Sequence, residues 1–209
     1  MIYRIFVEKK DNLQAKKIRD DLAAQLGIHA EDVREVIRYD VEGISEEEFE
    51  QAVAGVFSEP PVDTVYREEL PVAAGYSVFA IAFLDGQFDQ RADSAAQCVQ
   101  LLTQKERPLV KCARVICVKG VTAEELARIK HHLINPVESN EVSLSKPRTL
   151  KRARMSTHDV PEVFGLIGMS DEEIATYHKK NGFAMSVADL AFVRDYFKKE
   201  GRNPTETEV

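Results

Sequence analysis

The chain has 209 residues, of which 30% are charged and 44% are hydrophobic, and its net charge at pH 7 is −7. This composition is typical of a globular protein and is too acidic for a general nucleic-acid or anionic-membrane surface. The longest apolar run, residues 78–84, is too short to span a bilayer, and the N-terminus has no signal-peptide core. Three cysteines without C-x-x-C spacing fit a reducing compartment, so we expect a soluble cytoplasmic protein with no membrane partner.

The first third of the chain predicts the order strand, helix, strand, helix, strand. Apolar and polar side chains alternate over residues 3–8, which is the period of a half-buried strand. Apolar residues at helical spacing follow and stop at Gly27, a C-terminal cap. Ser45 and Glu48 form a capping box at the start of a second helix, which a proline pair ends. The other strands are expected at residues 33–41 and 62–66.

The next segment predicts the same order of elements. The strand expected at residues 76–84 is apolar on both faces, which favours burial from both sides. A helix is expected at residues 94–104, and Thr122 and Glu125 form the capping box of another. Further strands are expected at residues 110–118 and near 141–144. The first helix should turn Cys98, Val99, Leu101 and Leu102 inward.

These two segments are also similar in sequence. Residues 43–49 (GISEEEF) return 77 positions later as residues 120–126 (GVTAEEL), and Val33-Arg34 returns as Val110-Lys111. Two like halves usually pack about a two-fold axis, as the subunits of a homodimer do. We therefore predict an α+β domain over residues 1–145, with strand–helix–strand–helix–strand half-domains at 1–70 and 76–145 related by pseudo-two-fold symmetry and helices on one sheet face.

The character of the sequence changes after residue 145. A basic run with one proline predicts a linker, and two helical patterns follow, beginning after Ser170 and Ser186 and closed in the second case by Gly201. We expect a small helical linker domain at 146–209. Residues 203–209 have no character of a chain end, so the sequence resembles a truncation inside a longer protein. The basic run consists of Lys146, Arg148, Lys151, Arg152 and Arg154.

One loop of the second half, residues 86–98, has no counterpart in the first. In one interpretation Asp93 or Ser94 caps the following helix, Asp89 pairs with Arg91, and Phe88 is a hydrophobic staple. In the other, the loop docks onto a partner domain through charge-assisted contacts. The residues expected at such an interface are Gln87, Phe88, Asp89, Gln90, Arg91 and Asp93.

The usual catalytic devices are missing from the sequence. No glycine-rich phosphate loop is present. Cys98, Cys112 and Cys117 lie within helix or strand patterns and are expected to be buried and structural. His131 and His132 are adjacent and cannot chelate a metal together, and the remaining histidines (His29, His158 and His178) are isolated. We therefore assign no catalytic, cofactor-binding or metal-binding residue.

The sequence nevertheless resembles a known family over its whole length. The segments that carry the likeness are residues 1–10, 39–44, 86–98, 101–104, 134–138 and 203–205, of which GQFDQRADSAAQC at 86–98 is the most specific. They resemble the N-terminal part of large single-chain phosphoribosylformylglycinamidine synthases. In that family each half of the opening domain resembles a small, separate, dimerising subunit of split enzymes, and a helical linker domain follows.

The resemblance implies a role in purine biosynthesis. The family converts formylglycinamide ribonucleotide, glutamine and ATP, with Mg²⁺, to formylglycinamidine ribonucleotide, using synthetase and glutaminase domains that would lie beyond Val209. This part would then be a non-catalytic scaffold whose partners are those domains, with no cofactor of its own. The alternatives are a stand-alone interaction or small-ligand-sensing module of the same fold, and nucleic-acid binding through the basic run, which the negative net charge disfavours.

Overall fold

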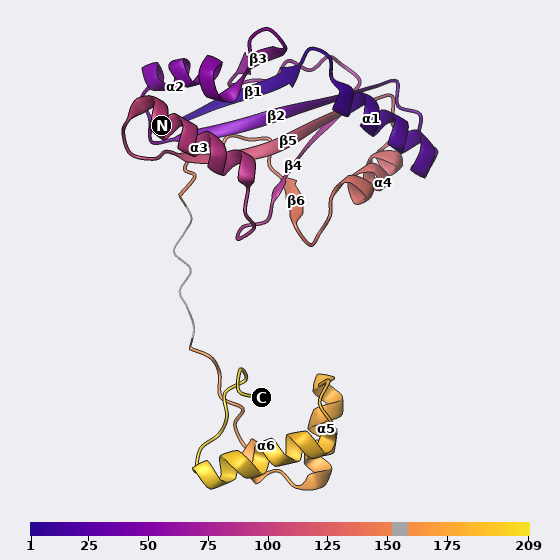
Figure 1. The fold of residues 1–209 in the computed structure, drawn as a ribbon. Coiled ribbons are helices and arrows are strands. Elements are labelled where there is room, and N and C mark those ends of the chain that lie inside the picture. Colours follow the sequence, from indigo (N-terminus) through magenta and orange to yellow (C-terminus); the bar gives the residue numbers. More distant parts are fainter. Residues whose placement is uncertain (152–158) are drawn as a thin grey trace. The chain divides into compact units, whose positions relative to one another are not determined.

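The computed structural model describes residues 1–151 and 159–209 (Figure 1). The chain divides into two compact units, Met1–Arg152 and Ala153–Val209. Arg152 and Arg154 of the predicted basic linker, and the isolated His158, lie outside the described residues.

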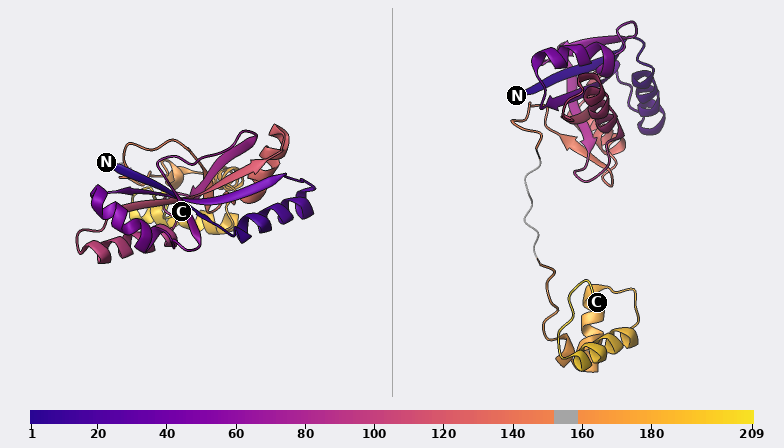
Figure 2. Two further views of the ribbon diagram at one scale, coloured as in Figure 1. Left: turned by 90° about the horizontal axis from the view of Figure 1, so that it is seen from above. Right: turned by 60° about the vertical axis from the view of Figure 1, so that its left-hand side comes forward.

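The first unit is built on a six-stranded antiparallel sheet with the strand order β3-β1-β2-β5-β4-β6. The two longest strands, β2 and β5, pair along their whole lengths at the centre, from Asp32 with Lys119 to Glu42 with Leu109. The strands fan out across the sheet with the usual twist (Figure 2). The strands are β1 (Ile2–Lys9), β2 (Asp32–Glu42), β3 (Asp63–Arg67), β4 (Tyr76–Phe83), β5 (Leu109–Lys119) and β6 (Ser139–Val142).

Along the sequence, the helices of the first unit connect these strands. Two of them, α1 and α2, continue into π-helical turns, Leu22–Leu26 and Val53–Phe57, and Gly27 closes the first with φ +66°. Both predicted capping boxes are confirmed, Ser45 with Glu48 and Thr122 with Glu125. The helices are α1 (Leu13–Asp21), α2 (Glu46–Ala52), α3 (Gln90–Thr103) and α4 (Ala123–Leu133).

The helices cover one face of the sheet in two apolar clusters. In one cluster α1 and α4 pack on Phe79 and Ile116, and in the other α2 and α3 pack on Ile5 and Tyr39. Alternate residues of the same strands form a third cluster on the opposite face, where Ala80 and Val115 are buried. β4 therefore buries residues on both of its faces, as its apolar sequence predicted.

Two connecting segments lie against the face of the sheet that carries no helix. The loop between β3 and β4 places Leu70 and Val72 against the third cluster. A second segment, residues 143–150, is held by side chains of β1 and β2, and we call it the strap. Arg38 donates to the Ser143 carbonyl at 2.8 Å, and the Glu42 carboxylate accepts from the Leu150 amide at 2.6 Å.

The start of α3 differs from the sequence prediction. The helix begins at Gln90, not Ser94, because Asp89 caps it by accepting from the Ala92 amide at 2.9 Å. Ala92, Ala95, Ala96 and Val99 therefore form the buried stripe. The expectation of buried Cys98, Leu101 and Leu102 was wrong: all three are exposed, since small alanines let the helix approach the sheet and leave those positions on its outer side.

The second unit is helical. The sequence predicted its two helices, α5 (Asp171–Asn181) and α6 (Val187–Glu200), which begin after Ser170 and Ser186 as expected, and each of these serines forms a capping box. Leu166 from a short 3-10 turn, Ile174 and Leu190 are fully buried in its small core. The last residues return to the start of the second unit, where Thr205 forms an isolated antiparallel β-bridge with Glu162. Within the C-terminal segment itself, Arg202 forms an ion pair with Glu208 at 2.6 Å.

No helix in the described part of the chain is long and apolar enough to cross a membrane.

Candidate functional site

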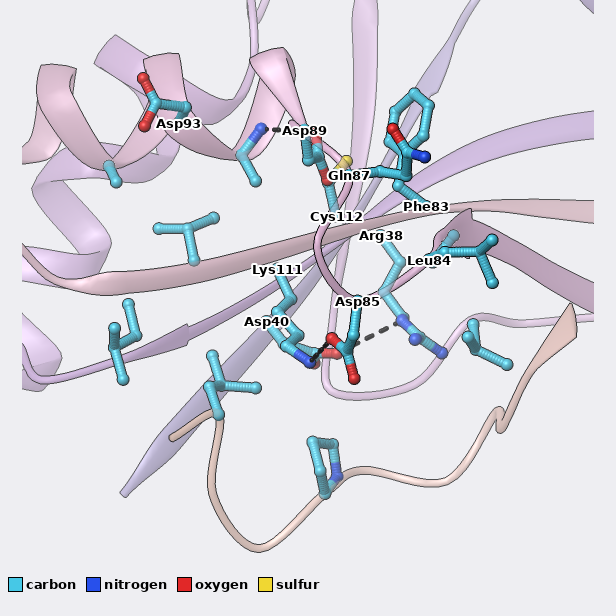
Figure 3. Close-up of a pocket in the computed structure, with 18 of the residues that line it drawn as sticks. Arg38, Asp40, Phe83, Leu84, Asp85, Gln87, Asp89, Asp93, Lys111 and Cys112 are labelled. Carbon is cyan, nitrogen blue, oxygen red and sulfur yellow. Dashed lines mark hydrogen bonds and ion pairs between the residues drawn. The ribbon is translucent and has the colours of Figure 1, made fainter. Parts of the chain in front are cut away.

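The loop that the sequence singled out borders a cleft of the first unit with a volume of about 890 Å³ (Figure 3). The cleft lies at one end of the sheet, between the end of β4, the start of β5, the first turns of α3 and the strap, and we call it the second-half cleft. It contains both apolar and charged side chains. Its main apolar lining residues are Phe83, Phe88, Leu109, Val110, Val142 and Leu150.

The loop itself is a tight turn between β4 and α3. The Gln87 amide donates to the Leu84 carbonyl at 3.0 Å, and Gly86 has φ +104°, a left-handed conformation that favours glycine. Phe88 follows with 69% of its surface exposed. A hydrophobic staple would need an apolar partner four residues after the cap Asp89, but Asp93 stands there, so Phe88 makes no staple.

The charged residues of the loop act mainly within the unit. Asp89 caps α3, and Asp93 accepts from Arg107 at 2.7 Å. Arg91 lies against Tyr39, whose hydroxyl raises the pKa of the Arg91 guanidinium through their hydrogen bond. Asp93 is thus a partner of Arg107 and does not cap the helix. The other three residues proposed for a domain interface, Gln87, Phe88 and Gln90, are exposed. Gln87 makes one long contact, from its side-chain amide to the Val137 carbonyl at 3.5 Å.

A buried ionic cluster stands behind the cleft. Arg4 Nε and Nη2 donate to the two oxygens of Asp40 at 2.6 and 2.9 Å, and Arg38 Nε lies 3.3 Å from the same carboxylate. All three side chains are at least nine-tenths buried. Burial lowers the pKa of Arg38, while the charge of Asp40 raises it. Arg4 also donates to the carbonyls of Leu144 and Ser145, so the cluster fixes the strap.

Sequence reasoning missed this cluster. Its signal is the pair of opposite charges at alternate positions of β2, Arg38 and Asp40, between the apolar residues Ile37, Tyr39 and Val41. Alternation places them on one face, where a buried charge needs a partner from a neighbouring strand. The partner, Arg4, becomes apparent only once the register of β1 against β2 is known, in which it lies opposite Asp40.

The remaining ionisable groups of the cleft do not form a catalytic arrangement. Burial raises the pKa of the Cys112 thiol to about 12, which keeps it protonated and unreactive at neutral pH. Lys111 faces Asp85 at 3.5 Å (Figure 3). Across residues 1–151 and 159–209, no three His, Cys, Asp or Glu side chains gather as metal ligands would.

The cleft does not fit a magnesium nucleotide. Arg107 and Lys111 each face a carboxylate within it, and Arg38 shares the carboxylate of Asp40 with Arg4. Backbone amides at the first turn of α3 are likewise occupied by the Asp89 side chain. The charged side chains Asp89, Asp93, Arg107 and Lys111 of the cleft are thus engaged mainly with groups of the same unit.

Comparison with known proteins gives one local similarity. A segment of 41 residues is 39% identical to the phosphoribosylformylglycinamidine synthase subunit PurL of Thermoplasma volcanium. The segment makes up 20% of this chain and 5% of the length of PurL. No protein-family model matches the chain. The similarity indicates a relation to PurL over a fifth of the chain.

Proposed function

We propose that this chain is the N-terminal structural part of a phosphoribosylformylglycinamidine synthase, the glutamine- and ATP-dependent ligase of purine biosynthesis. The local likeness to PurL supports the proposal, together with the resemblance of residues 86–98 and five other segments to the large single-chain enzymes. The chain covers only a small share of PurL, so the active sites, with their ATP and Mg²⁺, belong in this proposal to domains outside it.

The proposal includes a fused-dimer origin of the first unit. The strand order supports a pseudo-two-fold axis, because each half has its first strand in the middle, β1 between β3 and β2, and β4 between β6 and β5. The sequence repeat has an offset of 77 residues, which relates Ile37 to Arg114. Ile37 and Arg114 are paired directly opposite each other in β2 and β5. An antiparallel pair of equivalent residues is where such an axis would cross the sheet.

The observation that carries the scaffolding role is the loop at residues 86–93. It distinguishes the second half from the first, and it presents Phe88 to solvent beside the cleft. Exposed aromatic side chains beside a concave surface are typical of protein interfaces. In the proposed enzyme this surface contacts the synthetase and glutaminase domains and helps to couple glutamine hydrolysis to amidine formation.

The coupling role predicts a selective defect. Changing Arg91 to Ala in the full enzyme removes the hydrogen bond between the first turn of α3 and Tyr39 of β2. We expect glutamine-dependent activity to fall more than ammonia-dependent activity, because only the first needs the domains to be coupled. A matched control is Arg67→Ala, which removes an exposed arginine paired with Glu50, away from the loop and the cleft. Equal loss with both nitrogen donors, or no loss, would rule the role out.

A second candidate is a stand-alone module that senses a small ligand. The volume of the second-half cleft, about 890 Å³, falls within the usual range of ligand pockets. The two candidates differ in what the gene encodes after Val209: an ATP-binding domain supports the enzyme, and a stop codon supports the stand-alone module.

A further inference from the structure

The first half of the sheet has a smaller cleft, of about 540 Å³, at the opposite end. It is bordered by the end of β1, the start of β2, the first turns of α1 and Thr64 of β3. The second-half cleft is bordered by the corresponding elements of the other half: the end of β4, the start of β5, the first turns of α3 and Asn140 of β6. We call the smaller one the first-half cleft.

Strand register makes these clefts equivalent residue by residue. Val7 pairs with Ile37, and Ile81 pairs with Arg114, the repeat counterpart of Ile37. The next residues along β1 and β4 therefore correspond: Glu8 to Ala82, then Lys9 to Phe83. On the central strands the repeat relates Asp32 to Leu109. The adjoining helices agree, because Asn12 and Asp89 both cap their helix by accepting from the amide three residues on.

The two clefts differ in chemistry at four of their equivalent positions. The first-half cleft carries the ion pairs Arg34–Glu8, at 2.7 Å, and Lys16–Asp11, at 2.6 Å. The second-half cleft has apolar residues where the first has charged ones: Ala82 for Glu8, Phe83 for Lys9, Ala96 for Arg19 and Leu109 for Asp32. Phe83 and Leu109 remain 47% and 41% exposed, and Phe88 is added beside them.

An exposed apolar lining is costly in water unless something covers it, and the first half shows that the fold does not require it. The charges of the second-half cleft indicate what covers it. Because Arg107 pairs with Asp93 and Lys111 faces Asp85, an incoming charge would lose its water without gaining a free partner among these groups. These two pairs therefore give a charged occupant no advantage over an uncharged one, whereas the exposed apolar side chains favour an apolar occupant.

We propose that the second-half cleft binds an uncharged, apolar polypeptide segment from the part of the enzyme outside this chain, which packs against Phe83, Phe88 and Leu109. The first-half cleft has no such occupant. This inference rests on the proposed function, and the cleft is continuous with the loop proposed there as a domain interface.

Cysteine labelling tests the proposal in the intact protein. Phe83→Cys and Phe88→Cys are made in the second-half cleft, and Lys16→Cys, with a side chain 58% exposed, reports on the first-half cleft. Each is made in the full enzyme and in residues 1–209 alone, with exposed Cys98 changed to Ser. Maleimide modification of each position is followed by peptide mass spectrometry. We expect labelling at 83 and 88 to be at least about 10-fold slower in the full enzyme, with position 16 unchanged within about 2-fold.

Salt concentration tests the chemistry of the occupant. An apolar segment keeps positions 83 and 88 protected at 1 M salt, whereas a charged one releases them because exposed ion pairs are screened. Release at high salt, or equal labelling of positions 83 and 88 in both forms, overturns the proposal while leaving the proposed function standing. A gene that ends after the codon for Val209 overturns the proposed function itself, and this inference with it.

Discussion

The ionic cluster of Arg4, Asp40 and Arg38 predicts a large loss of stability when its only carboxylate is removed. Asp40→Ala leaves two guanidinium groups facing each other in a site where each side chain is less than one-tenth exposed. Breaking a buried pair in this way costs about 3 to 5 kcal/mol, because the remaining charge is buried without compensation. Here the cost should lie at the upper end, since two cations remain.

The contacts of the cluster add a second effect. Arg4 and Arg38 also donate to carbonyls of the strap, at 2.6 Å to Leu144 and 2.8 Å to Ser143. When the two cations repel each other, these bonds should weaken, and the strap should exchange its amide hydrogens faster. For a unit of this size, a loss of 3 to 5 kcal/mol lowers the melting temperature by roughly 6 to 20 °C.

A urea titration read by hydrogen exchange of β1 and β2 peptides measures the effect, because it follows the first unit alone. Asp40→Asn is the first comparison, since it keeps the shape and removes only the charge. Glu50→Ala is the second: it breaks the pair with Arg67, whose side chains are 45% and 50% exposed, and should cost less than about 1 kcal/mol. If Asp40→Ala costs no more than Glu50→Ala, the reasoning about buried charge is wrong.

Three other predictions concern two glycines, the reactivity of the thiols and the pH dependence of stability. Gly120→Ala should destabilise the first unit more than its repeat counterpart Gly43→Ala, as measured by urea unfolding. Both glycines have positive φ, which costs an alanine about 1 to 2 kcal/mol, but only at Gly120 would the new Cβ lie 2.6 Å from the Glu31 side chain. Equal losses would show that Glu31 moves aside freely. With a thiol reagent at pH 8, Cys98 should react in the folded protein and Cys112 and Cys117 only in urea, because burial raises their pKa values to about 12 and 11. These raised values also mean that the folded state holds the thiol protons more tightly than the unfolded state, so the stability they contribute is complete below about pH 9 and is lost as pH rises toward 12. A melting temperature that is constant from pH 8 to 11 would contradict this assignment.

Local signals in the sequence predicted the elements well. Each capping box needs only one residue and another three positions on, so Ser45 with Glu48 and Thr122 with Glu125 could be found without knowing the fold. The strand at the start of the second half was also predictable, because burial on both faces leaves an uninterrupted apolar run. The α+β class follows from these elements, and the single antiparallel sheet with its covering helices confirms it.

The start of α3 could not be predicted in the same way. Asp89, Asp93 and Ser94 are all good capping residues, and they lie within six positions of one another. The choice among them depends on which stripe of the helix can approach the sheet. The buried alanines 92, 95 and 96 decide it, yet alanine carries almost no hydrophobic pattern of its own. Cys98 and Leu101 were consequently assigned to the wrong side.

The candidate site was predictable as a segment and not as a surface. The sequence indicated residues 86–98 because they have no counterpart in the first half, but the cleft also needs Leu109 from β5 and Leu150 from the strap. These residues meet only because β4 and β5 are neighbours and the strap is tied to Glu42 by the Leu150 amide. Long-range pairing of this kind is decided by the whole sheet.

The pairing of β2 with β5 at the centre of the sheet has a consequence for synthesis on the ribosome. β2 ends at Glu42, and its partner β5 does not begin until Leu109. At about 5 to 20 residues per second, the longest strand of the first half waits several seconds or more with one edge unpaired. During that interval it is open to the same strand of a neighbouring nascent chain, a hazard of unpaired edges. Crowded polysomes are therefore where this protein is most exposed to misassembly.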